Sequence, residues 1–201
     1  MYQHVNQVYD AVDFSSQQLR DGELISCTFK RCNFASGSLE EIVTTNCRFV
    51  ECSFRGASLN GSIHTESAFE NCSFIEANLF VSKFDNCKMT GSDFSGANVD
   101  GITILLGDWS YTNLRYARLT KQDLRGVRFD EADLSASNLE KADLRDCELT
   151  KTVLAQANLQ GADLRGANMS GVDFTTFSVK GVRMDREQAA LLATALGAKI
   201  G

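Results

Sequence analysis

The 201-residue sequence contains no proline and only two histidines. Proline removes a backbone donor, so its absence is typical of a chain whose N–H groups are needed in a β-ladder. The histidines, His4 and His64, have no acid or nucleophile at a distinctive spacing, and no phosphate loop, zinc signature, nucleophile elbow or calcium-binding glycine repeat is present. We therefore expect no enzyme activity, no metal and no cofactor.

Long hydrophobic runs and excess positive charge are also missing. No stretch approaches the roughly 18 apolar residues of a membrane span, and the N-terminus lacks the pattern of a secretory signal, so we expect a cytoplasmic protein without membrane contact. Lys and Arg total 20 against 26 Asp and Glu, a formal charge of −6. Binding to DNA or RNA requires clustered Lys and Arg, so direct nucleic-acid binding is not expected, whereas a basic partner is compatible.

The net negative charge comes from the N-terminal half of the chain. Residues 1–100 carry 13 acidic and 7 basic side chains, whereas residues 101–201 carry 13 of each. A basic partner is therefore expected to contact the N-terminal half.

A five-residue repeat runs through most of the sequence. From Phe14 to Met184, every fifth residue is apolar at 33 of 35 positions, the exceptions being Thr44 and His64. The residue two places before such a centre is nearly always small, and this alternation predicts a strand with the centre and the small residue facing inward. Ten of the 15 glycines lie two residues after a centre, where a corner needs positive φ. The unbroken register predicts one repeat domain over residues 1–184.

A longer period of 20 residues gives the number of sides. The series Phe14, Phe34, Phe54, Phe74 and Phe94 recurs at that spacing. Four units per turn would stack these side chains, which predicts an all-β solenoid, a quadrilateral parallel β-helix. Thr44 and His64 fall on the same side of adjacent turns, where we expect a distorted turn. The triplets Asp-Leu-Arg at 123–125, 143–145 and 163–165 predict a surface ladder of ion pairs.

The cysteines follow the repeat as well. All seven occupy the small inward position: Cys27, Cys32, Cys47, Cys52, Cys72, Cys87 and Cys147. Metal ligands would converge on a point, whereas these form columns, so we interpret them as reduced, buried side chains. Stacked cysteines would come near disulfide distance, but their odd number in a cytoplasmic chain argues against bridges.

Residues 185–201 depart from the repeat and predict a short C-terminal α-helix. Asp185 can cap the helix, Gln188 occupies the capping-box position, and Gly197 can end it. Such a helix would cover the open edge of the rod. Its apolar side chains exceed what one cap needs, so we predict a helical cap and dimerisation segment that joins two rods end to end through Leu191, Leu192, Leu196 and Ile200.

One group of outward positions is unusually apolar. Phe80, Val81, Leu105 and Leu106 follow their centres, with Tyr111 and Tyr116 nearby. Two interpretations remain open: a partner-binding patch, or a bulge in which residues 102–109 leave the regular path.

The motif A(D/N)LXX, as in Ala132-Asp133-Leu134 and Ala142-Asp143-Leu144, resembles the pentapeptide-repeat family over about residues 9–184. The resemblance implies a right-handed β-helix. Residues 67–74 and the terminal Asp185-Arg186-Glu187-Gln188-Ala189 look like the topoisomerase-protecting group that includes MfpA, AlbG and the Qnr proteins. That resemblance implies a dimeric rod that imitates duplex DNA, occupies the basic DNA-binding surface of DNA gyrase, and protects or inhibits it, conferring resistance to a gyrase-targeting antibiotic. The alternative is a pentapeptide-repeat scaffold for a different protein partner.

The charge density limits this imitation. Duplex DNA carries about one charge per 1.7 Å, whereas a charge of −6 on a rod of about 42 Å, from turns about 4.8 Å apart, gives one per about 7 Å. Mimicry must therefore be patchy and strongest in the N-terminal half. The acidic candidates for gyrase binding there are Glu40, Glu41, Glu51, Glu66, Glu70, Glu76, Asp85 and Asp100.

Overall fold

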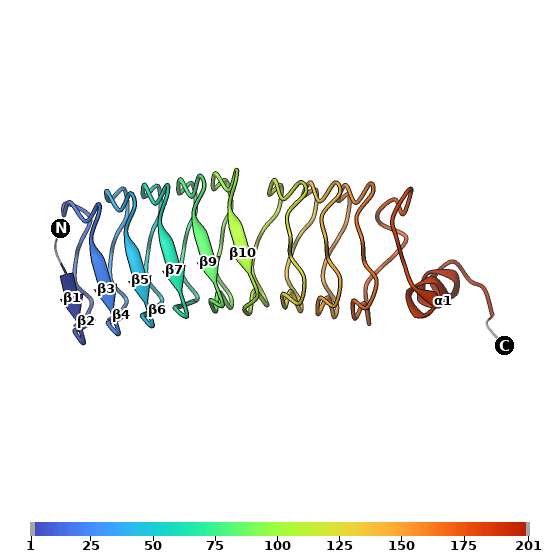
Figure 1. Ribbon diagram of the computed structural model, residues 1–201, viewed down its shortest axis with the longest axis horizontal. Helices are drawn as coiled ribbons and strands as arrows, with labels where there is room; N and C mark the ends of the chain where they lie inside the picture. The colour runs from blue at the N-terminus through green and yellow to red at the C-terminus, as the bar shows by residue number, and fades with distance from the viewer. Residues whose placement is uncertain (1–2, 200–201) are drawn as a thin grey trace.

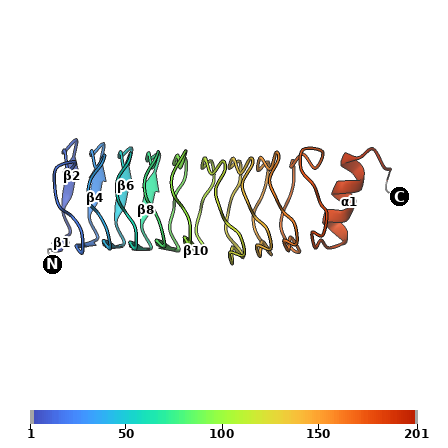
Figure 2. The ribbon, with the colours of Figure 1, turned by 90° about the horizontal axis from the view of Figure 1, so that it is seen from above.

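The computed structural model, which describes residues 3–199, is a rod of stacked turns closed at one end by a helix (Figures 1 and 2). One parallel sheet has the order β1-β3-β5-β7-β9-β10 and a second has the order β2-β4-β6-β8. The first sheet consists of β1 (Gln3–Val5), β3 (Glu23–Ile25), β5 (Val43–Thr45), β7 (Ile63–Thr65), β9 (Lys83–Asp85) and β10 (Thr103–Leu105). The second consists of β2 (Val8–Asp10), β4 (Thr28–Lys30), β6 (Arg48–Val50) and β8 (Ala68–Glu70), and the helix is α1 (Arg186–Ala195).

Every pairing joins residues twenty apart. β1 pairs with β3 at Gln3↔Glu23, β9 pairs with β10 at Lys83↔Thr103, and isolated bridges continue the same step to Asp163↔Arg183. One turn is therefore twenty residues with four sides, and the predicted quadrilateral β-helix is confirmed. We call the sides face A (centres at Phe14 and every twentieth residue), face B (Leu19), face C (Leu24) and face D (Phe29). Face C carries the six-stranded sheet and face D the four-stranded sheet.

The interior consists of columns of like side chains. Phe14 stacks on Phe34 with ring centroids 4.8 Å apart, and Phe34 on Phe54 at 4.9 Å, with planes inclined by 6° and 4°. Such offset stacking adds a favourable interaction beyond the burial of area. The core is therefore one continuous apolar column.

The corners hold the chain in the left-handed region. The ten corner glycines have φ between +62° and +76°, as predicted, but 24 non-glycine residues also adopt positive φ. Asn, Glu, Lys and even Tyr are accepted, because the corner side chain points to solvent. Val81, with φ +52°, is the one β-branched residue among these in residues 3–199, and a β-branched side chain is strained in that region.

The expected distortion at Thr44 and His64 is wrong. Both side chains are buried, and the strands that carry them pair in register at Thr44↔His64. Thr44 Oγ1 lies 2.8 Å from His64 Nδ1, and His64 Nε2 lies 2.9 Å from Ser62 Oγ. A buried polar side chain with both ring nitrogens in hydrogen bonds fits the core without disturbing the turn.

The ladder opens between the turn that contains β10 and the next. On faces B and C of that junction, the described residues lack seven consecutive hydrogen bonds that every adjacent junction makes. Figure 1 shows a wider gap after β10. The unpaired backbone N–H groups belong to Gly96, Val99, Gly101, Ile104, Leu106, Arg118 and Asp123. We call this opening the seam; on faces A and D the ladder is intact, for example from Trp109 N to Arg128 O at 2.7 Å.

Trp109 accounts for the seam. Its side chain is fully buried on face D, with its ring 5.4 Å from Phe94 and 5.5 Å from Phe84, both in the preceding turn. An overfilled core is relieved by movement of the backbone, and the seam lies on face B, across the core from this indole, and on the adjoining face C. Glycine at position 107 allows the backbone to lie close to the turn below, because an added Cβ there would lie 2.2 Å from the Cys87 carbonyl oxygen.

The bulge interpretation of residues 102–109 is wrong. β10 keeps its register with β9, and Lys88↔Asp108 and Asp108↔Arg128 keep the twenty-residue step. No residue is inserted; the irregularity is a separation between turns.

The last turn is irregular too. Thr176 N bonds to Asp173 O at 3.4 Å, so its first corner comes one residue early, and Gln156 N bonds to Thr176 O. Phe177 occupies a position that is small in the turns below, such as Ala157 and Ala77. The ladder is regular again at Asp163↔Arg183. The irregular part of the repeat therefore lies before Met184.

α1 is capped as predicted. The Asp185 side chain accepts from the N–H groups of Glu187 and Gln188, and Gln188 Oε1 accepts from Asp185 N. Gln188 Nε2, which is buried, also donates to Leu164 O at 2.6 Å and Ala167 O at 2.9 Å. The helix thereby satisfies carbonyl groups on the open end of the ladder.

Candidate functional site

The outer surface carries the candidate site, and the eight acidic candidates are spread around it. Their repeat positions place Glu40 and Asp100 on face B, Asp85 on face C and Glu70 on face D. Glu41, Glu51, Glu66 and Glu76 stand at the four different corners, all with positive φ. The structure therefore brings Glu40 and Glu41 together but does not gather the eight into one patch.

Half of these carboxylates are already paired with cations. Asp85 lies 2.9 Å from Lys83, Asp100 lies 3.3 Å from Arg118, and Glu76 lies 3.4 Å from Arg55. Glu70 contacts both Arg48 at 2.7 Å and Lys88 at 2.8 Å. In residues 3–199, the candidates outside these ion pairs are Glu40, Glu41, Glu51 and Glu66.

Glu70 is the most firmly neutralised of the eight. Hydrogen bonds from Lys88 and then Arg48 lower the pKa of its carboxyl group, more than its partial burial raises it. An acid held between two cations presents little negative potential to a partner. Glu70 is therefore the weakest candidate for imitating a phosphate.

The corner between faces B and C gathers the densest acidic group. Glu40 and Glu41 lie one turn above Arg20 and Asp21, and Glu23 follows on face C. Asp21, Glu23, Glu41 and Val43 line a hollow of about 290 Å³. The initial candidates omitted Asp21 and Glu23, although the twenty-residue step places Asp21 directly below Glu41. The structure thus adds two acids to the Glu40–Glu41 pair.

The predicted ladder of ion pairs on face C is confirmed. Each Arg contacts the Asp two residues before it through two hydrogen bonds, for example Arg145 Nε and Nη2 to Asp143 at 2.9 and 2.6 Å. Arg165 does the same with Asp163 and lowers the pKa of that carboxyl group to about 2. Exposed pairs of this kind contribute little stability, and they leave the C-terminal half of face C neutral.

Burial makes three of the cysteine thiols poor nucleophiles. All seven are buried and free, and burial raises the pKa of Cys47 and Cys87 to about 11 and of Cys147 to about 12. A thiol that stays protonated is a poor nucleophile and a poor metal ligand. No group of three His, Cys, Asp or Glu side chains that could hold a metal occurs in the described part of the chain.

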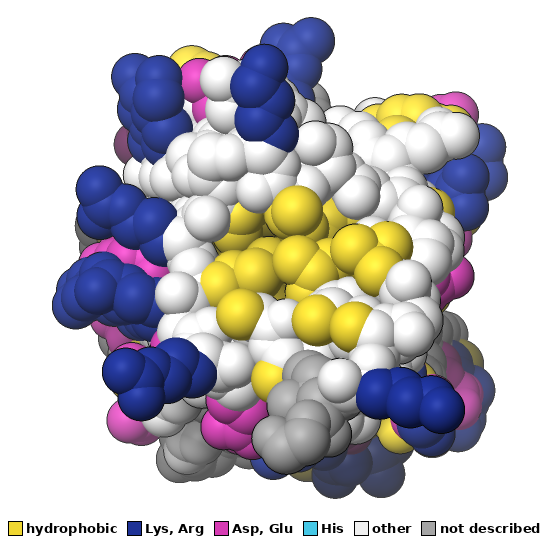
Figure 3. Space-filling view, turned by 90° about the vertical axis from the view of Figure 1, so that its right-hand side faces the viewer, with side chains coloured by type: hydrophobic (Ala, Val, Ile, Leu, Met, Phe, Trp, Pro, Cys, Tyr) yellow, Lys and Arg dark blue, Asp and Glu magenta, His cyan; other side chains and the backbone are white. Residues whose placement is uncertain are grey.

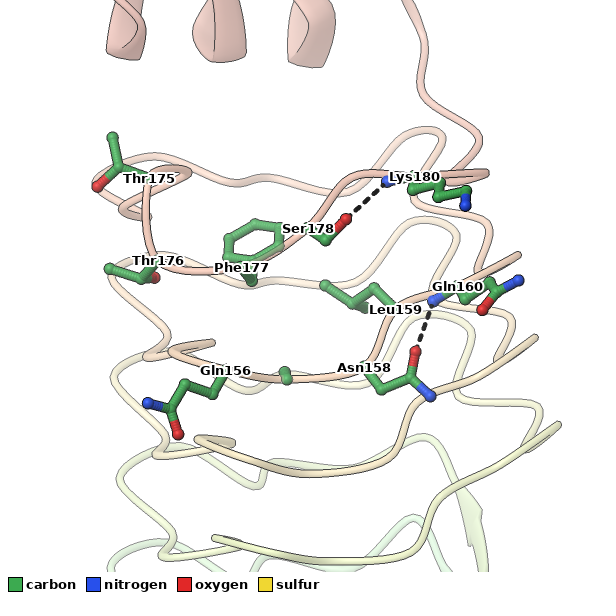
Figure 4. Close-up of a pocket in the computed structure, with 10 residues that line it drawn as sticks. Gln156, Asn158, Leu159, Gln160, Thr175, Thr176, Phe177, Ser178 and Lys180 are labelled. Carbon is green, nitrogen blue, oxygen red and sulfur yellow. Dashed lines mark hydrogen bonds between the residues drawn. The ribbon is translucent and has the colours of Figure 1, made fainter.

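A hollow of about 600 Å³ separates residues 156–160 from residues 175–180 on face B (Figure 4). Phe177 stands between the two backbones near Leu159, with polar side chains around them. Lys180 is the one ionisable side chain in the lining. The lining has Ser and Thr hydroxyl groups but no carboxylate or imidazole that could serve them as a general base.

The C-terminal end of the rod is apolar. Figure 3 shows hydrophobic side chains gathered at the centre of this end, with Lys and Arg around its margin. Leu191 and Leu196 of the predicted interface are exposed, whereas Leu192 is half-buried and packs against the core. Ile200 lies outside the described residues. α1 has ten residues, too few to cross a membrane, and no other helix of residues 3–199 could do so.

Eight copies of the pattern described as pentapeptide repeats match residues 27–63, 52–91, 69–103, 112–150 and 137–175, most of the chain. The chain belongs to the pentapeptide-repeat family. No protein of curated function matches its sequence. Among solved structures, this pentapeptide-repeat protein is similar to two trypsin-treated variants of QnrB1, described as a plasmid-mediated fluoroquinolone resistance protein.

One variant has a TM-score of 0.86 at 22% identity, covering 99% of this chain and 100% of that chain. The other has 0.84 at 22%, covering 98% and 99%. Full-length QnrB1 gives 0.53 at 20%, covering 98% and 100%. At this identity the likeness establishes the fold of the pentapeptide-repeat protein and not its activity.

Proposed function

We propose that this pentapeptide-repeat protein is a DNA mimic that binds the basic DNA-binding surface of DNA gyrase, modulates or protects the enzyme, and so confers resistance to a gyrase-targeting antibiotic. The near full-length likeness to QnrB1 is the observation that carries the proposal. The protein acts as a binding partner rather than as an enzyme, and it works in the cytoplasm, where gyrase works.

The charge distribution supports an N-terminal contact. Within residues 3–199, the one ion pair made by the acidic corner of Asp21, Glu23, Glu40 and Glu41 joins Asp21 to Arg20 at 3.6 Å. A concentrated group of carboxylates on a narrow rod raises the local concentration of a basic partner. Glu51 and Glu66 add charge at two other corners.

The rod acts as a homodimer joined at its apolar C-terminal end. The exposed Leu191 and Leu196 side chains there belong to α1, and the margin carries Lys and Arg. Two rods joined in this way present an acidic N-terminal half at each far end, which doubles the length of surface available to a duplex-binding enzyme.

The test is a supercoiling assay with purified gyrase, with and without a fluoroquinolone, across a titration of this protein. We expect reduced supercoiling without the drug or preserved supercoiling with it, and competition with DNA that weakens steeply as salt rises. Supercoiling unchanged in both arms at micromolar protein would refute the proposal.

A scaffold for a different protein is the second candidate. It is favoured by the pairing of Glu70, Glu76, Asp85 and Asp100 with cations, which lowers the free negative charge below that of a uniform mimic. Binding to another protein that is insensitive to salt would support it.

A further inference from the structure

We propose that partner binding, taken to be to gyrase as above, depends on an apolar ridge on the border between faces B and C. The ridge consists of Val43, Ile63, Phe80 and Val81. It would meet an apolar contact on the partner that is flanked by Lys or Arg.

The ridge is continuous in the ladder. Val43 and Ile63 are register partners in β5 and β7. Gly61, two residues before Ile63, donates its N–H to the carbonyl of Phe80 at 2.9 Å, so Phe80 and Val81 lie in the turn directly above. The four side chains therefore follow one border over three successive turns.

Glycines make the ridge stand out. Gly61 and Gly101 occupy the same corner one turn below and one turn above Val81, and a Cβ on Gly101 would come within 3.0 Å of Val81 Cγ1. The side chains of Phe80 and Val81 are 48% and 50% exposed, and Ile63 is 42% exposed. These values are high for large apolar groups with no neighbour to cover them.

Val81 keeps its place at a cost in stability. Its corner has φ +52° and is filled by glycine one turn away on both sides. A β-branched side chain in the left-handed region is strained, and strain that persists beside relaxed equivalents points to a role outside folding. Burial against a partner supplies such a role.

The surroundings of the ridge define the partner. Glu40 and Glu41 lie two turns below Phe80 and Val81, about 10 Å along the rod, and Asp100 lies one turn above. Because Asp100 is paired with Arg118, a matching surface has an apolar centre with basic side chains on the side that meets Glu40 and Glu41. Uniform DNA mimicry needs carboxylates alone, so the ridge distinguishes a protein-specific contact from general imitation of a duplex.

The test measures the affinity of the full chain for purified gyrase by interferometry at low and high salt. In the ridge variant, Phe80→Ser with Val81→Gly, we expect a loss of about tenfold or more at both salt concentrations, because apolar contacts are not screened. The variant should unfold at a temperature no lower than the wild type, since Val81→Gly relieves the strained corner.

Two controls separate the possible outcomes. Val8→Ser with Val153→Ser removes exposed apolar groups from faces D and A and should leave the affinity unchanged. Glu40→Gln with Glu41→Gln should flatten the salt dependence. Wild-type affinity in the ridge variant, beside a loss in the acidic variant, would overturn the ridge and keep the proposed function. Absence of binding by the wild type would overturn both.

Discussion

His64 is a neutral histidine sealed in the core. Full burial lowers its pKa from 6.5 to about 3. The unfolded chain binds a proton at this residue below pH 6.5 and the folded chain does not until about pH 3. Its contribution to stability is therefore complete above pH 6.5 and is lost progressively as the pH falls through that window.

We expect the free energy of unfolding to fall by about 2 kcal/mol between pH 7 and pH 5 on account of His64. Denaturant unfolding at the two pH values checks this. The double variant Thr44→Leu, His64→Phe continues the Leu24 and Phe84 column and removes the titrating group. If wild type and variant lose equal stability between these pH values, His64 does not carry the effect.

Leu139 tests the inward assignment of the centres. Its side chain is fully buried among the stacked leucines, and a charge at that position has no partner or water. Leu139→Asp should unfold the rod at 25 °C, because an uncompensated buried carboxylate costs several kcal/mol. Circular dichroism checks this; Asn138→Asp, on the outward neighbour, is the control that should fold normally.

The seam is a weak connection in the β-helix. The amides of Val99 and Ile104 lack the acceptors that Leu79 and its neighbours find one turn below. We expect these two amides to exchange hydrogen about tenfold faster than those of Leu79 and Phe84, since each missing hydrogen bond is worth about 1 kcal/mol. Hydrogen exchange resolved by NMR measures this.

Trp109→Phe tests the cause of the seam. A smaller ring, of the kind found at Phe129 one turn above, should let faces B and C close and slow exchange at Val99 and Ile104. Unchanged exchange in a variant that remains folded would exclude the indole as the wedge.

The regular elements could be predicted from the sequence because each turn repeats the same local rule. The centres, the inward cysteines and the positive-φ corners follow from the five-residue period, and the capping box of α1 follows from the spacing of Asp185 and Gln188. The seam could not be predicted, because it depends on how one indole displaces a neighbouring turn. The irregular last turn depends in the same way on Phe177. The five-residue period specifies where each side chain lies, whereas the seam and the irregular last turn arise from the volume of two large side chains.

The candidate site was harder to predict than the fold. Repeat arithmetic could have placed Asp21 beneath Glu41, and would have shown that Glu66, Glu70 and Glu76 face three different directions. It could not have shown that Glu70 forms ion pairs with both Arg48 and Lys88. Contacts between side chains of neighbouring turns depend on the rotamer that each side chain adopts.

At the scale of the whole molecule, the proposed association of two rods can be tested at the exposed end. Leu191→Glu with Leu196→Glu should give a monomer, because the charges would face each other across an apolar contact. Light scattering measures the mass. Val153→Glu, on the side of the rod, is the control. A dimer that survives the helix variant would move the interface elsewhere.

Each turn takes twenty residues and returns the chain to the same column, so the length of the rod is a whole number of equal steps. Removing residues 128–147 would join Val127 to Glu148, which lies directly above Arg128 in the next turn. The rod would then be one turn shorter, and neither half would rotate relative to the other. The distance between the acidic corner and the C-terminal end can therefore change in whole turns, with every side chain pointing in the same direction as before.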